Sequence, residues 1–161
     1  PNIIPTARQA TTLSNGTSLH IVPSKTIPQG VAALLAYNPE DDSQSNLGAM
    51  ETALKTVTTL EVTRAVRSAT IGDLNVGEGQ YIGLLEGEVV AAGESALDAL
   101  RQTLANLAPG TGQLLTLYWG SDTDEDEANE AGSSLKQSFD GLEVEVVHGG
   151  QPLYRFIASL E

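Results

Sequence analysis

Residues 114–147, LLTLYWGSDTDEDEANEAGSSLKQSFDGLEVEVV, contain the pattern that decides the fold class. The apolar run Leu114–Trp119 predicts a strand, and an Asp-Gly turn precedes a second predicted strand, Leu142–Val147. Between them, Thr123 is a candidate N-cap, and the acidic residues that follow it suit the positive end of a helix that runs to about Phe139. This alternation of strand, helix and strand predicts an α/β fold.

The residues on either side add four more strands and one helix. Apolar positions at helical spacing predict a helix from Ala96 to Leu107, which ends at a Pro-Gly pair. Glycine-rich turns separate the strands, and the pair Glu86-Gly87 predicts a tight hairpin. The predicted strands are Leu60–Val66, Tyr81–Leu85, Val89–Ala92 and, at the C-terminal end, Leu153–Leu160.

The N-terminal residues predict a second, smaller α/β segment. Thr6–Leu13 predicts a short helix, and a Ser-Asn-Gly turn at Asn15 separates it from a short buried strand, Leu19–Pro23. Pro28 lies where proline favours the first turn of a helix, which continues through Val31–Tyr37. A strand that leads into a helix in this way is typical of a parallel sheet.

A polar, helix-breaking segment at residues 38–45 marks the predicted boundary between two domains. We expect residues 1–40 to be the C-terminal remnant of a Rossmann-like lobe. We expect residues 46–161 to be a mixed-sheet α/β domain that begins with an amphipathic helix over Leu47–Val57. The chain starts with Pro1 rather than Met, so we expect it to be a piece of a longer protein.

The chain carries 8 lysines and arginines against 21 aspartates and glutamates, a formal net charge of −13. Because nucleic-acid binding needs clustered cations to displace counterions from phosphates, we expect no nucleic-acid partner. Anionic membrane surfaces are disfavoured for the same reason, and no apolar run approaches the roughly 20 residues that a membrane helix requires. We therefore expect a cytoplasmic protein without membrane insertion, whose charge favours solubility and a basic protein partner.

The sequence offers little support for a catalytic centre. It contains no cysteine, and its two histidines, His20 and His148, lie far apart without the spacing of metal ligands. The acidic residues 122–127 lack the glycine and the closing glutamate of an EF-hand loop. The glycines of residues 77–83 precede a strand, whereas a phosphate-binding loop follows a strand and opens a helix, so they predict hairpin turns. We expect no catalytic residue, metal or bound cofactor in this chain.

The stretch SKTIPQG, residues 24–30, lies between a predicted strand and the start of a predicted helix. Lys25 and two hydroxyl residues accompany the helix N-terminus, where free amides and the helix dipole favour an anion. A well-capped structural turn that contacts a protein partner accounts for the same residues. The sequence leaves both alternatives open.

Four stretches of the chain are informative together: IVPSKTIPQGVAALLAYNPE (residues 21–40), RAVRSATI (64–71), GQYIG (79–83) and HGGQPLY (148–154). In order and spacing they resemble the C-terminal region of the FakA-type fatty acid kinase subunits, a DhaL-domain family formerly described as dihydroxyacetone-kinase-like. The resemblance covers nearly the whole chain. Its specific parts are the first stretch and the Gly-Gly-Gln-Pro of the last.

The resemblance implies a longer parent protein with three parts. In that family, an N-terminal helical domain binds ATP and magnesium, a middle domain carries catalytic cysteine and histidine residues, and the C-terminal part is related to the DegV-like fold. A separate DegV-like protein presents a bound fatty acid, and the parent phosphorylates its carboxylate. Because the residues for ATP, magnesium and catalysis have no counterpart here, we expect a non-catalytic region that docks the DegV-like fatty-acid-binding protein.

We expect docking residues in two polar turns at the ends of elements, where rigid α/β scaffolds present partner surfaces. Two alternatives remain. A free-standing fatty-acid-binding module of DegV-like fold would need a deep apolar cavity, and a structural module that forms a homodimer would need an exposed apolar face on the helix Leu47–Val57. The predicted partner-binding residues are Ser24, Lys25, Thr26, Gln29, His148 and Gln151.

Overall fold

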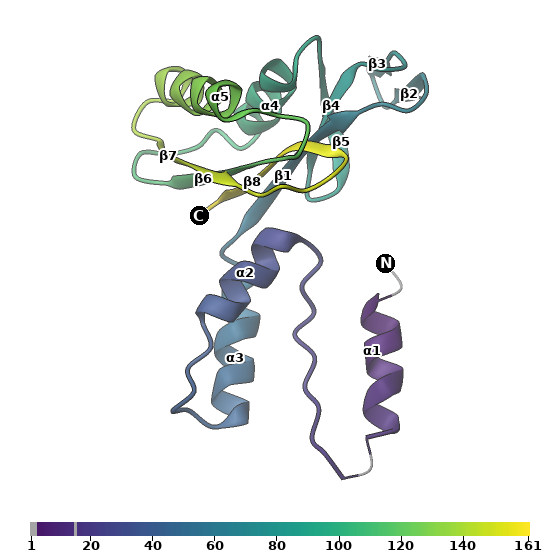
Figure 1. The fold of residues 1–161 in the computed structure, drawn as a ribbon, viewed down its shortest axis with the longest axis vertical. Coiled ribbons are helices and arrows are strands. Elements are labelled where there is room, and N and C mark those ends of the chain that lie inside the picture. Colours follow the sequence, from purple (N-terminus) through teal and green to yellow (C-terminus); the bar gives the residue numbers. More distant parts are fainter. Residues whose placement is uncertain (1–2, 15) are drawn as a thin grey trace. The chain divides into compact units, whose positions relative to one another are not determined.

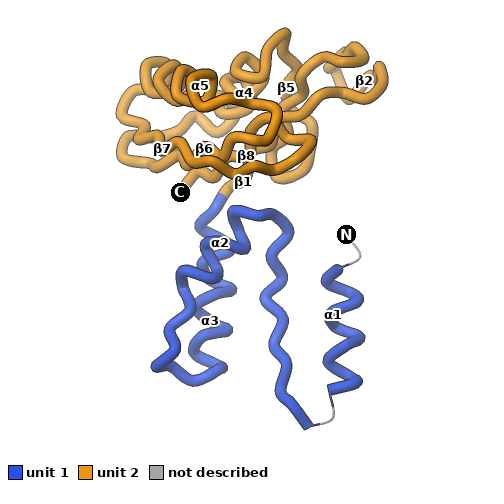
Figure 2. Tube along the Cα trace, in the orientation of Figure 1, with its two compact units in different colours: residues 1–57 blue, residues 58–161 orange. Residues whose placement is uncertain are grey.

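A computed structural model describes residues 3–14 and 16–161 and divides the chain into two compact units, residues 1–57 and 58–161 (Figure 2). The turn predicted at Asn15 lies outside the described residues.

Unit 1 contains three helices: α1 (Ile3–Thr12), α2 (Ile27–Leu35) and α3 (Ser43–Ala53) (Figure 1). The three predicted helices are confirmed, although α1 and α3 start and end earlier in the chain than expected and α2 ends two residues earlier. α2 begins at Ile27 with Pro28 in its first turn, as the sequence predicts, and Thr26 is its N-cap. Within unit 1, α2 packs against α3.

The connection between α2 and α3 is fixed by the buried side chain of Asn46. Its Oδ1 accepts the main-chain N–H of Asn38 at 2.7 Å, and its Nδ2 donates to the carbonyl of Asn38 at 2.8 Å and to two further carbonyls. Residues 38–45 therefore form an ordered turn and the first residues of a helix. The structure divides the chain between Val57 and Thr58, with α3 packed on α2, whereas the sequence placed the boundary at these residues.

The strand expected over Leu19–Pro23 is wrong. Residues 18–25 are not part of any helix or strand, and the described part of unit 1 contains no strand with which they could pair. An extended segment becomes a strand only when a neighbouring strand satisfies its N–H and C=O groups. The assignment of residues 1–40 to a Rossmann-like lobe stays a prediction.

Unit 2 is built on a six-stranded mixed sheet with the strand order β5-β4-β1-β8-β6-β7 (Figure 1). Neighbouring strands are antiparallel except β6 and β7, which are parallel. The mixed sheet and each of its strands confirm the predictions, with ends that differ by at most two residues. The strands are β1 (Thr58–Arg64), β4 (Tyr81–Leu85), β5 (Glu88–Gly93), β6 (Leu114–Trp119), β7 (Glu143–His148) and β8 (Tyr154–Leu160).

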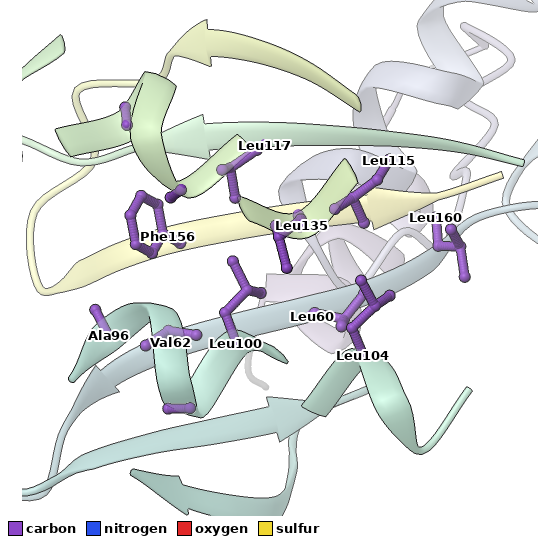
Figure 3. Close-up of a cluster of buried hydrophobic side chains, with 14 of the residues drawn as sticks. Leu60, Val62, Ala96, Leu100, Leu104, Leu115, Leu117, Leu135, Phe156 and Leu160 are labelled. Atoms are coloured by element: carbon purple, nitrogen blue, oxygen red, sulfur yellow. The ribbon is translucent and has the colours of Figure 1, made fainter. Parts of the chain in front are cut away.

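Two helices, α4 (Ala96–Ala105) and α5 (Glu125–Ser138), cover one face of this sheet (Figure 1). Alternate strand residues point toward the helices and form the core with the inward side chains of α4 and α5. Figure 3 shows this core, whose fully buried large side chains include Leu60, Val62, Leu100, Leu104, Leu115, Leu117, Leu135 and Phe156.

Two glycines let α4 approach the sheet closely. A Cβ atom at Gly83 of β4 would lie 1.8 Å from the hydroxyl oxygen of Thr103, and one at Gly93 of β5 would lie 2.6 Å from the main-chain nitrogen of Ala99. Both distances are far below van der Waals contact, so only glycine fits at either position. The helix therefore packs directly on the backbone of these strands.

A small hairpin between β1 and β4 was not expected from the sequence. It consists of β2 (Ala69–Ile71) and β3 (Leu74–Val76), which form a separate two-stranded sheet. At its base, Ala65 donates its N–H to the carbonyl of Gln80 at 2.8 Å and accepts the N–H of Gly79 at 2.8 Å. The interpretation of the glycines of residues 77–83 as turn residues is confirmed for Gly79, which has φ +80°, and is wrong for Gly83, which lies inside β4.

Candidate functional site

The carboxyl ends of the parallel strands β6 and β7 meet at one edge of the sheet in unit 2. Trp119 and His148 are the last residues of these strands and lie opposite each other in the ladder. Their ring centroids are 4.1 Å apart, with 46° between the ring planes. In α/β sheets, ligands and partners often bind outside the carboxyl ends of parallel strands. This edge, called the carboxyl edge below, is therefore a candidate binding site.

Helix α5 starts at the same edge, because it connects the end of β6 to the start of β7. Its N-cap is Asp124, whose carboxylate accepts the N–H of Glu127 at 2.8 Å. The prediction that Thr123 caps the helix is wrong: Thr123 is buried, and its hydroxyl donates to the carbonyl of Arg155 at 3.3 Å. That bond directs the hydroxyl toward β8 and leaves the cap to the next residue.

The start of α5 presents a strongly negative surface. Residues 121–130 contain six acidic residues and no lysine or arginine. Glu127 pairs with Arg155, and the hydrogen bond between them is the main cause that raises the pKa of the Arg155 guanidinium. The other five are exposed and have no ion pair within the described residues. These five, called the acidic surface below, are Asp122, Asp124, Glu125, Asp126 and Glu130.

A hollow of about 340 Å³ lies between the aromatic pair and the acidic surface. It is lined by Trp119, Glu125, Asn129, Val146 and His148. An aromatic face beside a carboxylate attracts a lysine or arginine side chain through cation–π and ion-pair interactions. The carboxyl edge therefore has the chemistry to hold a basic group of another protein.

The turn that follows β7 is tied firmly to β6. The N–H groups of Gly149 and Gly150 both donate to the carbonyl of Trp119 at 3.0 Å. The side-chain amide of Gln151 donates to the carbonyl of Tyr118, also at 3.0 Å. Gln151, which the sequence predicted as a partner contact, thus uses its amide to hold the turn, whereas His148 is exposed at the edge. A direct contact of either residue with a partner stays a prediction.

A second hollow, of about 230 Å³, lies where β1 ends and β8 begins. The guanidinium of Arg64 lies 4.2 Å above the centre of the Tyr81 ring and donates to the Tyr81 hydroxyl at 2.6 Å. The hollow, called the Leu153 hollow below, is lined by Thr63, Arg64, Val66, Tyr81, Asp122, Leu153 and Arg155. The Leu153 hollow could not be predicted from the sequence, because the sequence does not show whether an apolar side chain in a loop is buried or faces solvent.

In unit 1, the predicted residues at the start of α2 form a reciprocal cap. The hydroxyl of Thr26 accepts the N–H of Gln29 at 3.3 Å, and the side chain of Gln29 accepts the N–H of Lys25 at 3.0 Å. These two hydrogen bonds occupy the main-chain N–H groups of Lys25 and Gln29, which a bound anion would need. They therefore favour the structural turn over the anion site. Ser24, the remaining residue of the set, donates its N–H to the carbonyl of Val22 at 2.9 Å.

The six predicted residues therefore divide between the two units. Four lie at the start of α2 in unit 1, and His148 and Gln151 lie at the carboxyl edge of unit 2. Whether the two groups serve one partner stays a prediction.

No three His, Asp or Glu side chains come together as a candidate metal site in residues 3–14 and 16–161. None of the described helices is long and apolar enough to span a membrane.

A family model for the C-terminal region of FakA-like fatty acid kinase subunits matches residues 1–161. The chain belongs to this family. Protein YloV of Bacillus subtilis (strain 168) is a relative of this FakA-like chain, 32% identical over 160 residues. An uncharacterized protein, SH1689, of Staphylococcus haemolyticus (strain JCSC1435) is 30% identical over 160 residues. Each match covers 99% of this chain and 29% of the relative, so the chain spans less than a third of these proteins.

Solved structures of the DegV family share the fold of this FakA-like chain. The DegV family protein Cg2579 of Corynebacterium glutamicum aligns with a TM-score of 0.61 and 14% identity, over 98% of this chain and 68% of that one. The fatty acid binding DegV family protein SAG1342 of Streptococcus agalactiae aligns with a TM-score of 0.59 and 12% identity, over 97% and 64%. The DegV-like α/β fold predicted from the sequence is confirmed.

Proposed function

We propose that this chain docks a DegV-like fatty-acid-binding protein onto the ATP-using subunit of a fatty acid kinase. The observation that carries the proposal is the acidic surface beside the Trp119–His148 pair at the carboxyl edge. Membership of the FakA-like family supplies the context. The partner contributes a basic surface, whose lysine or arginine side chain enters the hollow between Trp119 and Glu125.

Charge and aromatic groups play different parts in such a contact. The five carboxylates of the acidic surface attract a basic partner and raise its association rate, an effect that salt weakens. The aromatic pair provides a fixed, partly apolar face, which is the kind of group that contributes most of the affinity in protein interfaces. The turn at Gln151 holds His148 in place, so Gln151 acts on docking through the position of that ring.

In the proposed reaction, the fatty acid stays on the DegV-like partner while its carboxylate is phosphorylated. ATP and magnesium belong to parts of the parent protein outside this chain, as the family resemblance implies. The contribution of this chain is to keep the partner close to the kinase site. Holding two reactants together raises their effective concentration and removes much of the entropic cost of their meeting.

Biolayer interferometry with a purified DegV-family protein from the same organism, loaded with fatty acid, tests the proposal. The variant Asp126→Asn/Glu130→Gln removes two charges from the acidic surface, and Glu88→Gln/Glu94→Gln removes two exposed charges at the other end of the sheet. We expect the first variant to associate several-fold more slowly and with a weaker salt dependence, and the second to behave like the unchanged chain. No binding by the unchanged chain, or equal effects of both variants, would contradict the proposal.

Lys25→Ala tests the contribution of unit 1 in the same assay. Lys25 is an exposed cation on a chain of net charge −13, so its removal changes any contact that the start of α2 makes with the partner. An unchanged rate and affinity would restrict the docking site to unit 2.

A second candidate function is fatty acid binding by the chain itself. The observation in its favour is the fold shared with DegV proteins described as fatty acid binding. Native mass spectrometry of the purified chain separates the two candidates: docking alone predicts the mass of the bare polypeptide, and retained lipid adds the mass of a fatty acid. The same spectra would reveal a homodimer, the third alternative.

A further inference from the structure

Two large apolar side chains of unit 2 face solvent far more than the others. Val66 and Leu153 are 89% and 81% exposed, whereas the other exposed large apolar residues of this unit, Ile71 and Val147, are 40% and 39% exposed. Val66 and Leu153 come from distant parts of the sequence, yet both line the Leu153 hollow. Scattered exposed apolar residues are ordinary, but two that meet at one hollow mark a contact surface.

The backbone of Leu153 adds an independent observation. Its φ is +72°, in the left-handed region that a branched side chain rarely adopts. The conformation is held by a hydrogen bond in which the hydroxyl of Thr63 donates to the carbonyl of Leu153 at 2.6 Å. Glycine would adopt this conformation without strain, and the exposed leucine side chain adds nothing to the core. A strained residue whose side chain faces outward is typical of a functional position.

The floor of the hollow is held in shape by its polar groups. Arg64 donates to the carbonyl of Gly79 at 3.1 Å and to the hydroxyl of Tyr81. Arg155 is held by the carboxylate of Glu127 and by the carbonyl of Asp122. Because both guanidinium groups are fixed before any partner arrives, little side-chain freedom is lost when the hollow is filled.

We propose that Val66 and Leu153 form the apolar anchor of the docking site and take an aliphatic or aromatic side chain of the DegV-like partner. This inference rests on the proposed docking function. The hollow itself is lined by Arg64, Arg155 and Asp122, and Arg155 is paired with Glu127. Asp122 also belongs to the acidic surface, so the partner is identified by charge complementarity with that surface, and its basic residues lie beside the inserted side chain. Protein interfaces commonly combine a central apolar anchor with a charged rim in this way.

Leu153→Gly is the decisive variant, because it removes the side chain and suits the observed backbone. We expect its thermal unfolding midpoint to be unchanged or raised. We expect its affinity for the fatty-acid-loaded DegV-family protein to fall by about 30-fold, mainly through faster dissociation. Val66→Ser removes the second side chain of the anchor and should weaken binding in the same direction. Val147→Ser, a matched change of an exposed valine outside the hollow, should leave binding unchanged.

The outcomes separate the anchor from docking itself. If Leu153→Gly and Val66→Ser bind like the unchanged chain while Asp126→Asn/Glu130→Gln associates slowly, docking stands and the anchor is overturned. A lowered unfolding midpoint for Leu153→Gly, or an equal loss of binding with Val147→Ser, would also overturn the anchor. If the unchanged chain does not bind the DegV-family protein, the proposed function fails and the anchor fails with it.

Discussion

Gly83 shows how one missing side chain sets the distance between a helix and a sheet. Replacing Gly83 with alanine would place a Cβ atom 1.8 Å from the hydroxyl of the buried Thr103 and 2.9 Å from the carbonyl of Ala99. We expect a loss of about 1–3 kcal/mol in the free energy of unfolding, because α4 must move away from β4. Urea unfolding followed by circular dichroism measures it. Gly110→Ala is the control, since its nearest neighbour would be 3.7 Å away; an equal loss in both variants would contradict the packing argument.

Glu61, a residue of β1, makes the free energy of unfolding depend on pH. Its half-buried position raises the pKa of its carboxyl group above the ordinary 4.5, first through desolvation and then through repulsion from Glu86. Between pH 4.5 and the raised pKa, the folded chain binds more protons than the unfolded chain, so the contribution of Glu61 to stability falls as pH rises. At pH 7 the charged carboxylate is therefore unfavourable in the folded state.

Glu61→Gln should remove this effect. We expect the variant to be more stable than the unchanged chain at pH 7, and the difference to shrink as pH falls through the raised pKa and to vanish below 4.5. Urea unfolding over a pH series measures it, with Glu88→Gln, which replaces an exposed carboxylate, as the control. A difference that stays constant with pH would show that titration of Glu61 is not the cause.

At the scale of elements, Asn46 decides whether α2 and α3 stay together. Asn46→Ala removes four hydrogen bonds to the main chain of residues 38–42, of which the carbonyls of Asn38 and Asp42 keep a second, main-chain donor. We expect unit 1 to lose about 2 kcal/mol or more of local stability. Limited proteolysis should then cut residues 38–45 much faster than in the unchanged chain. Gln44→Ala, an exposed change on the same helix, should leave the cleavage rate unaltered.

The strands of unit 2 could be predicted because each carries a local signal that agrees with its tertiary setting. Glu86 and Gly87, for example, both have positive φ, as a tight hairpin turn requires. The errors lie where the deciding factor is distant in sequence. The segment Leu19–Pro23 has the composition of a strand but no neighbour to pair with in the described part of unit 1, and the three-residue strands β2 and β3 are too short to show a period.

The candidate site could be predicted only in part, for the same reason. His148 and Gln151 were found through the turn that contains them. The ring that contacts His148 is that of Trp119, and their contact depends on the register between β6 and β7, which the sequence does not contain. Val66 and Leu153 have no local signal at all, since only their exposure in the folded chain distinguishes them from core residues.

At the scale of the whole molecule, the two units differ in how much apolar surface they bury. In the described part of unit 1, the side chains of Ile3, Leu34 and Leu35 are mostly exposed, whereas unit 2 has a continuous core. Few buried apolar contacts mean a low free energy of local opening. We expect the amides of α1 and α2 to exchange with solvent about 100-fold faster or more than those of β1 and β8. Hydrogen exchange followed by mass spectrometry measures both units; equal protection would contradict this difference.

Strand β7 is an edge strand of the six-stranded sheet, and its sequence affects whether the chain aggregates in concentrated solution. An open strand edge is a template for aggregation, because its unpaired N–H and C=O groups can join the edge of another copy. Glu143 and Glu145 alternate along β7 with half-buried valines, so two such edges repel each other when they approach. Glu143→Val/Glu145→Val should therefore convert a chain that stays dispersed at pH 7 into one that forms β-rich aggregates. Light scattering would record the change, and Asp126→Val/Glu130→Val, two exposed positions on helix α5, would show whether the loss of charge alone is sufficient.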